Sequence, residues 1–130
     1  MNDDTMEFED NFRSVDEVEP ERFEWGARKF LVNAATVRDA KMTLAVVWIA
    51  PGKEEPLHSH PNCEQLVHVL DGECEFELGD TLYHLDAGDT VRIPAGVTHQ
   101  ALNSGWEPVR LLATFNVGAV VTNPVKAGTQ

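Results

Sequence analysis

The chain has 130 residues, of which 42% are hydrophobic and 25% charged, and its formal net charge is −12. This length is enough for one domain with a sizeable core and is too short for two. The acidic balance argues against nucleic-acid binding, and no apolar run approaches the roughly 20 residues that a membrane span needs, so we expect neither partner.

The chain begins with a strongly acidic segment. Residues 1–24 hold ten of the 22 acidic residues and two of the ten basic ones. We expect a solvated, partly disordered N-terminal arm over 1–24, with a short helical turn after Ser14, and one folded domain over 25–130. A protein-binding arm is the alternative. The start of the chain lacks the basic and apolar regions of a signal peptide, so we expect a cytoplasmic protein.

From residue 25 onward, short apolar stretches alternate with turn residues, a pattern typical of strands. The predicted strands are 30–33, 42–50, 66–70, 73–78, 81–85, 90–93 and 109–117. The segment 73–78 alternates acidic and apolar residues, and the turn signal Gly79-Asp80 joins it to 81–85 in a hairpin. Many short strands without a sustained helical period predict an all-β sandwich or barrel.

Three histidines and a glutamine are the candidate metal ligands. His58 and His60 point to the same face of an extended strand, because side chains alternate with a period of two. Gln65 follows within the same segment, and His99 comes 34 residues after it. Imidazole is the commonest protein ligand for transition metals, so these residues predict a metal site if the fold brings them together.

The residues around these ligands resemble the two signature motifs of the cupin family. The first motif reads Gly52, five residues, His58, one residue, His60, four residues, Gln65, six residues, Gly72. The second reads Gly88, five residues, Pro94, one residue, Gly96, two residues, His99, three residues, Asn103. The second motif matches at every specified position. The first departs at Gln65, where the family usually carries a glutamate.

The resemblance implies an all-β fold, a double-stranded β-helix or jelly-roll barrel preceded by the acidic arm. It also implies one divalent transition metal ion (Zn, Ni, Fe, Mn or Cu) held by His58, His60, Gln65 and His99. Glu64 is the alternative ligand, but its register leaves seven residues before Gly72, one more than the family pattern. Alternation puts Glu64 and Gln65 on opposite faces, so we prefer Gln65.

Several other residues have two interpretations. Arg92 could clamp a substrate carboxylate or pair with acidic groups on the surface, and the surface role is favoured. We expect His68, His84, Cys63, Cys74 and Tyr83 to play no part in the site. Core packing is favoured over a pocket-lining role for Trp48, Met42, Phe76 and Phe115.

The resemblance implies a metalloenzyme acting on a small oxygenated organic molecule, as a dioxygenase, isomerase or lyase, although whether the chain is an enzyme stays open. The alternative is a non-catalytic cupin that binds or senses a small molecule and holds a structural metal. Cupins pair through edge strands and N-terminal segments, so we expect a homodimer. The other expected partner is a small-molecule substrate or ligand.

Overall fold

The computed structural model describes residues 11–125, and strands make up most of them. The helical element among these residues is one turn of 3-10 helix, η1 (Val15–Glu17). It confirms the predicted turn after Ser14, although the Ser14 side chain makes no capping hydrogen bond. None of the helices in residues 11–125 is long and apolar enough to cross a membrane.

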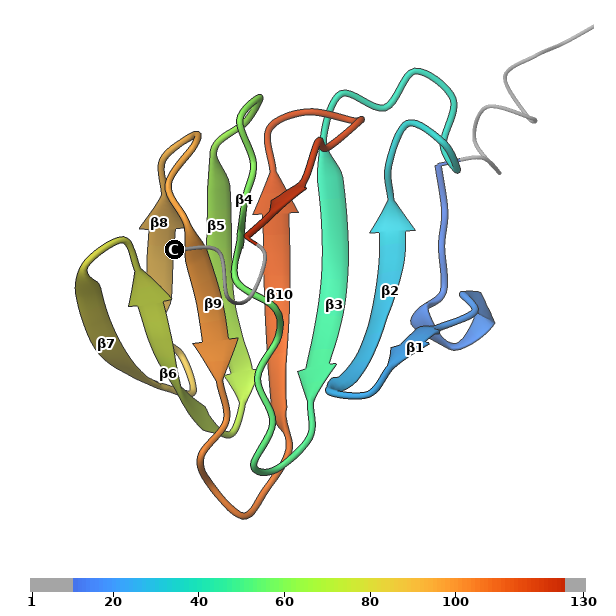
Figure 1. Ribbon diagram of the computed structural model, residues 1–130. Coiled ribbons are helices and arrows are strands. Elements are labelled where there is room, and N and C mark those ends of the chain that lie inside the picture. Colours follow the sequence, from blue (N-terminus) through green and yellow to red (C-terminus); the bar gives the residue numbers. More distant parts are fainter. Residues whose placement is uncertain (1–10, 126–130) are drawn as a thin grey trace, which may run out of the picture.

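Two antiparallel sheets face each other and confirm the predicted all-β double-stranded β-helix (Figure 1). The larger sheet contains, in spatial order, β1 (Glu21–Phe23), β2 (Gly26–Val32), β3 (Thr43–Ile49), β10 (Val109–Phe115), β5 (Gln65–Asp71) and β8 (Thr90–Ile93). The smaller sheet contains β11 (Asn123–Pro124), β4 (His58–Ser59), β9 (His99–Leu102), β6 (Glu73–Leu78) and β7 (Thr81–Asp86).

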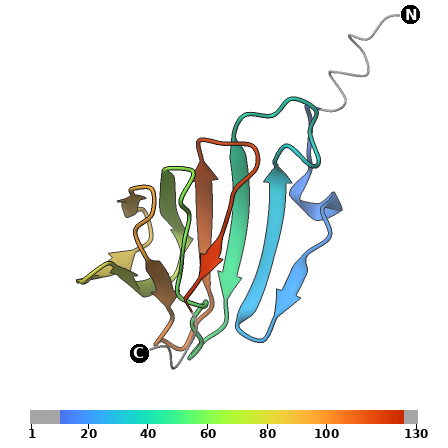
Figure 2. The same ribbon diagram turned by 45° about the horizontal axis from the view of Figure 1, so that its top comes forward.

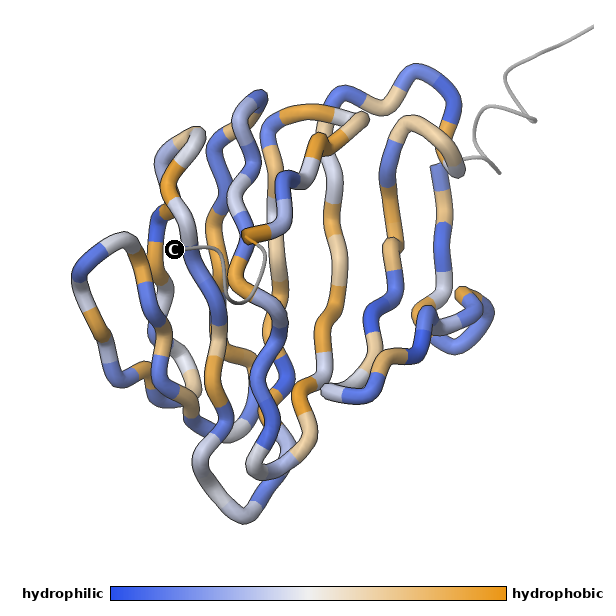
Figure 3. The backbone as a smooth tube through the Cα atoms, viewed as in Figure 1, coloured by the Kyte–Doolittle hydropathy of each residue, from blue (hydrophilic) through white to orange (hydrophobic). Residues whose placement is uncertain are grey.

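The core lies between the two sheets. Strand β3 is apolar along most of its length (Figure 3) and contributes the buried Val47 and Ile49. From the smaller sheet, Phe76 is fully buried in the same cluster, while the acidic neighbours of Phe76 on β6 point outward. Gly72 links β5 to β6 with a φ of 87°, and a Cβ there would lie 2.8 Å from a backbone oxygen. A tight, close-packed turn of this kind favours glycine.

The hairpin β1–β2 extends the larger sheet past the edge of the smaller one (Figures 1 and 2). Strand β1 lies within the segment that the sequence assigned to the arm, and it pairs with β2 through Glu21 opposite Arg28 and Phe23 opposite Gly26. No strand of the smaller sheet is hydrogen-bonded beyond β11 among the described residues. The inner face of the hairpin therefore borders a cavity instead of packing against a second sheet.

Candidate metal centre

The fold brings the three motif histidines together. His58 lies on β4, His60 directly after that strand, and His99 opposite His58 on β9. Their potential ligand atoms all lie within 4.8 Å of one another. The ring centroids are 4.9 Å apart for His58 and His60, 4.3 Å for His58 and His99, and 5.2 Å for His60 and His99. Three imidazoles at this spacing form a triad able to share one metal ion.

Backbone carbonyls orient all three rings in the same way. Each Nδ1 lies against a carbonyl oxygen that can only accept, so Nδ1 carries the proton and the Nε2 lone pair is left for a ligand. The distances are 2.6 Å from His58 to Pro56, 3.1 Å from His60 to Val121 and 2.9 Å from His99 to Val97. Such outer contacts fix the orientation of metal-binding histidines.

Burial also sets the protonation of two of the three rings. The pKa values of His60 and His99 are each lowered to about 4, mainly because burial disfavours the charged ring. The neighbouring His58 lowers both values further. Both rings are therefore neutral near pH 7, which is the form that binds a metal.

Gln65 brings an amide oxygen to the same interior. Its side chain is buried, and Oε1 has no hydrogen-bond partner; His99 Nε2 is in the same condition. A buried acceptor without a partner costs about 1–3 kcal/mol. One cation accepting electron pairs from both atoms would remove both costs. The donor set of three imidazoles and one amide oxygen therefore fits a divalent transition metal.

The two candidates for the fourth ligand face opposite sides of β5. Gln65 lines the interior, whereas the Glu64 side chain is 42% exposed and pairs with Arg92 across to β8. Arg92, 62% exposed, takes the surface role and does not enter the cavity. Strand alternation alone had favoured this arrangement of the neighbouring side chains.

A cavity of about 460 Å³ adjoins the triad. His58, His60 and Gln65 line it, and so does Phe115, which is also buried in an apolar core cluster as the sequence had favoured. The other residues considered as lining lie elsewhere: Phe76 is in the core, Trp48 contributes to a separate surface groove, and Met42 is 55% exposed. Small-molecule sites commonly have volumes of about 300–1,000 Å³.

Two charged residues of the cavity, Glu55 and Arg28, were missed by the sequence analysis. Glu55 lies three positions before His58, and its Oε1 accepts a hydrogen bond of 3.1 Å from the Ala101 N–H. Burial raises the pKa of the Glu55 carboxyl, while the charges of His58 and Arg28 act in the opposite direction. An acidic residue inside the first motif, three positions before a candidate ligand, was a usable signal, whereas nothing in the sequence around Arg28 distinguished it.

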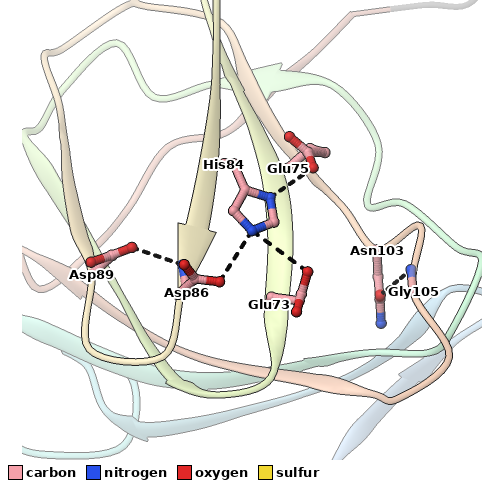
Figure 4. A network of polar contacts seen from close by, with 7 residues as sticks. All are labelled: Glu73, Glu75, His84, Asp86, Asp89, Asn103 and Gly105. Atoms are coloured by element: carbon pink, nitrogen blue, oxygen red, sulfur yellow. Dashed lines mark hydrogen bonds and ion pairs between the residues drawn. The ribbon is translucent and has the colours of Figure 1, made fainter.

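Residues that the sequence set aside lie away from the triad. His84 sits on the surface hairpin, where Nδ1 contacts Glu75 at 2.9 Å and Nε2 contacts Asp86 at 3.1 Å (Figure 4). His68 contacts Thr90, 2.7 Å away on β8, and the buried Cys63 packs in an apolar cluster. The last residue of the second motif, Asn103, binds the carbonyls of Ile49 and Glu107 and so has a structural role.

Two facing antiparallel sheets around an inward-pointing histidine triad define the class of small β-barrel proteins with a site suited to one metal. Residues 45–115 match the family model described as the cupin domain, which is more than half of the chain. The chain belongs to the cupin domain family, and the resemblance found in its two motifs is confirmed.

Two similar proteins come from Streptomyces. Protein SchB of Streptomyces halstedii is 30% identical over 111 residues, covering 85% of this chain and 79% of that protein. Polyketide synthase CurC of Streptomyces cyaneus is 28% identical over 110 residues, covering 85% of this chain and 70% of that protein.

Larger proteins share only a part with this chain. The rhicadhesin receptor of Pisum sativum is 35% identical over 80 residues, covering 58% of this chain and 37% of the receptor. Among solved structures, the oxalate decarboxylase of Bacillus subtilis, which has Mn(II) centres, superposes with a TM-score of 0.79 at 22% identity, covering 85% of this chain and 31% of that one. The chain thus spans about a third of these larger proteins, and the structural likeness shows the fold alone.

Proposed function

We propose that the protein is a mononuclear metalloenzyme that acts on a small oxygenated organic molecule as an isomerase, lyase or dioxygenase. One observation carries the proposal: the buried acceptor atoms Gln65 Oε1 and His99 Nε2 lack partners, and Gln65 lines a cavity of about 460 Å³ together with the other two histidines of the triad. A cation would accept electron pairs from both unpaired atoms, and the cavity gives a small molecule room to reach that cation.

His58, His60, Gln65 and His99 would hold the ion. When bound, a divalent metal would supply Lewis acidity toward a substrate oxygen. Because imidazole and amide ligands bring no negative charge to a metal, such a site would keep the full positive charge of the ion and favour an anionic substrate. Glu55 lines the same cavity, and burial raises the pKa of its carboxyl, which favours its holding a proton beside the substrate.

The relatives support this choice of substrate. SchB and CurC match this chain over most of their own length, and the name of CurC is polyketide synthase. Polyketide intermediates carry several carbonyl and enol oxygens, which are suitable ligands for a hard or borderline metal ion. Manganese is the first metal to test, because the similarly folded oxalate decarboxylase has Mn(II) centres. The small-molecule partner, the homodimer and the cytoplasmic location stay predictions.

A non-catalytic cupin with a structural metal is the competing function. The two functions differ in metal access, since a catalytic ion must exchange a coordinated water or substrate oxygen. Here the cavity reaches His58 and His60 directly, which favours the enzyme.

The test begins with elemental analysis of protein purified without added metal. We expect about one equivalent of a divalent transition metal in the wild type and a clear loss in His99→Ala, with His68→Ala as the matched control outside the triad. Water-proton relaxation of the manganese-loaded protein then reports exchangeable water at the ion. A wild-type protein that binds no metal contradicts the proposal, and bound metal without exchangeable water supports the structural role.

A further inference from the structure

We propose that Arg28 and the aromatic side chains around it form a subsite for the planar, anionic part of the ligand. The inference deepens the proposed function, on which it rests for the role of the metal. It concerns the end of the cavity formed by the β1–β2 hairpin. The sequence analysis named Arg92 as a possible clamp for a substrate carboxylate. The structure assigns that role to Arg28 instead.

Arg28 is held at the cavity in a fixed orientation. Its Nε and Nη2 donate to the two carboxylate oxygens of Glu21, at 3.1 and 3.3 Å. Its guanidinium lies over the ring of Phe23, 5.1 Å from the centroid, and over the ring of Phe30, at 4.8 Å. The Nη1 donors have no hydrogen-bond partner among the described residues. A guanidinium fixed by a carboxylate and two rings, with donors to spare, is preorganised to bind an oxyanion.

Arg28 also supplies the positive charge at this end of the cavity. No lysine and no second arginine is found among the described residues that line it. Half of the Glu21 side chain is exposed, at 51%, compared with 35% for Arg28. The Glu21 carboxylate is therefore the more solvated member of the pair. Water screens its negative charge, so it neutralises the positive charge of Arg28 only in part.

The rest of this end is flat and apolar. Phe23 and Trp25 stack with their centroids 4.8 Å apart and their planes within 3°, and both line the cavity. Farther along the larger sheet, Ala45 lies opposite Phe30 on β2, and Ala113 lies opposite Ala45 on β10; both small side chains line the cavity. The stacked rings present a flat aromatic face to the cavity, and such a face favours a flat, unsaturated ligand over a bulky saturated one. The geometry thus points to an aromatic or conjugated carboxylate or enolate.

The test measures binding of three probes to metal-free protein by isothermal titration calorimetry. The probes are 2-naphthoate, its uncharged analogue 2-naphthamide, and hexanoate, which has the charge without the ring. In the wild type we expect 2-naphthoate to bind about tenfold or more tightly than 2-naphthamide. A factor of this size corresponds to the free energy that a hydrogen bond to a charged group typically contributes. Arg28→Gln should abolish this preference, and Phe23→Leu should weaken 2-naphthoate several-fold while leaving hexanoate nearly unchanged. Arg92→Gln, the exposed arginine, is the matched control and should bind like the wild type.

Equal binding of 2-naphthoate and 2-naphthamide by the wild type overturns the inference, and so does unchanged 2-naphthoate binding by a folded Arg28→Gln. A thermal melt checks the fold of each variant. If Arg28→Gln does not fold, Arg28→Lys keeps the charge without the planar fork and should give an intermediate preference. Since the titrations use metal-free protein, a protein that discriminates the probes but binds no metal refutes only the metalloenzyme. A protein that binds metal but ignores the probes refutes only the subsite.

Discussion

Replacing Gln65 with leucine is expected to have opposite effects on the stability of the metal-free and the metal-bound protein. The buried Oε1 of Gln65 has no partner, and an unsatisfied acceptor costs about 1–3 kcal/mol. Without metal, Gln65→Leu should therefore raise the free energy of unfolding by about 1 kcal/mol, or roughly 3–5 °C in Tm. A metal at 100 times its Kd should stabilise the wild type by about 2.7 kcal/mol. Loss of one of four donors, if it weakens binding about tenfold, should remove about 1.4 kcal/mol of that gain.

Differential scanning calorimetry of chelator-treated protein, with and without excess MnCl₂, measures both effects on the same sample. Glu64→Leu is the matched control, because Glu64 is the adjacent residue and pairs with Arg92 on the outside of the sheet. It should leave the metal-induced shift in Tm unchanged. If Gln65→Leu destabilises the metal-free protein, or keeps the full metal-induced shift, then Gln65 is an ordinary packing residue and the proposed ligand role fails.

Acid should destabilise the metal-free protein between about pH 6.5 and about 4, because unfolded histidines take up protons there while His60 and His99, with pKa values of about 4, do not. Urea melts across that range measure the slope, and the loss should be smaller in His60→Gln. The hydrogen bond to Glu75 raises the pKa of His84, so its stabilising contribution is present in acid and disappears as the pH rises through that raised value. An NMR titration should place the pKa of His84 above 6.5, and Glu75→Gln should lower it. Phe76→Ala empties a fully buried position and should cost about 3–5 kcal/mol in a denaturant melt, unless the core closes over it.

The sequence by itself determined the features that depend on neighbouring residues. Alternation predicted the β6–β7 hairpin and placed Gln65 inside and Glu64 outside, because successive side chains on a strand face opposite sides. Motif spacing identified the histidines that the structure brings within 4.8 Å of one another. The predicted strand 90–93 coincides with β8, and the strands β3 and β10 begin or end within two residues of their predictions.

Only the tertiary structure decided which charged and aromatic residues share the cavity. Arg28 and Arg92 both lie on strands of the larger sheet, yet one faces inward at its edge and the other outward. Strand β1, a three-residue element in an acidic segment, has too little apolar pattern of its own to predict. It forms by pairing with β2 and thereby brings Phe23 to the cavity. Local alternation fixes only which side chains share a face; which face meets the interior depends on how the whole sheet packs.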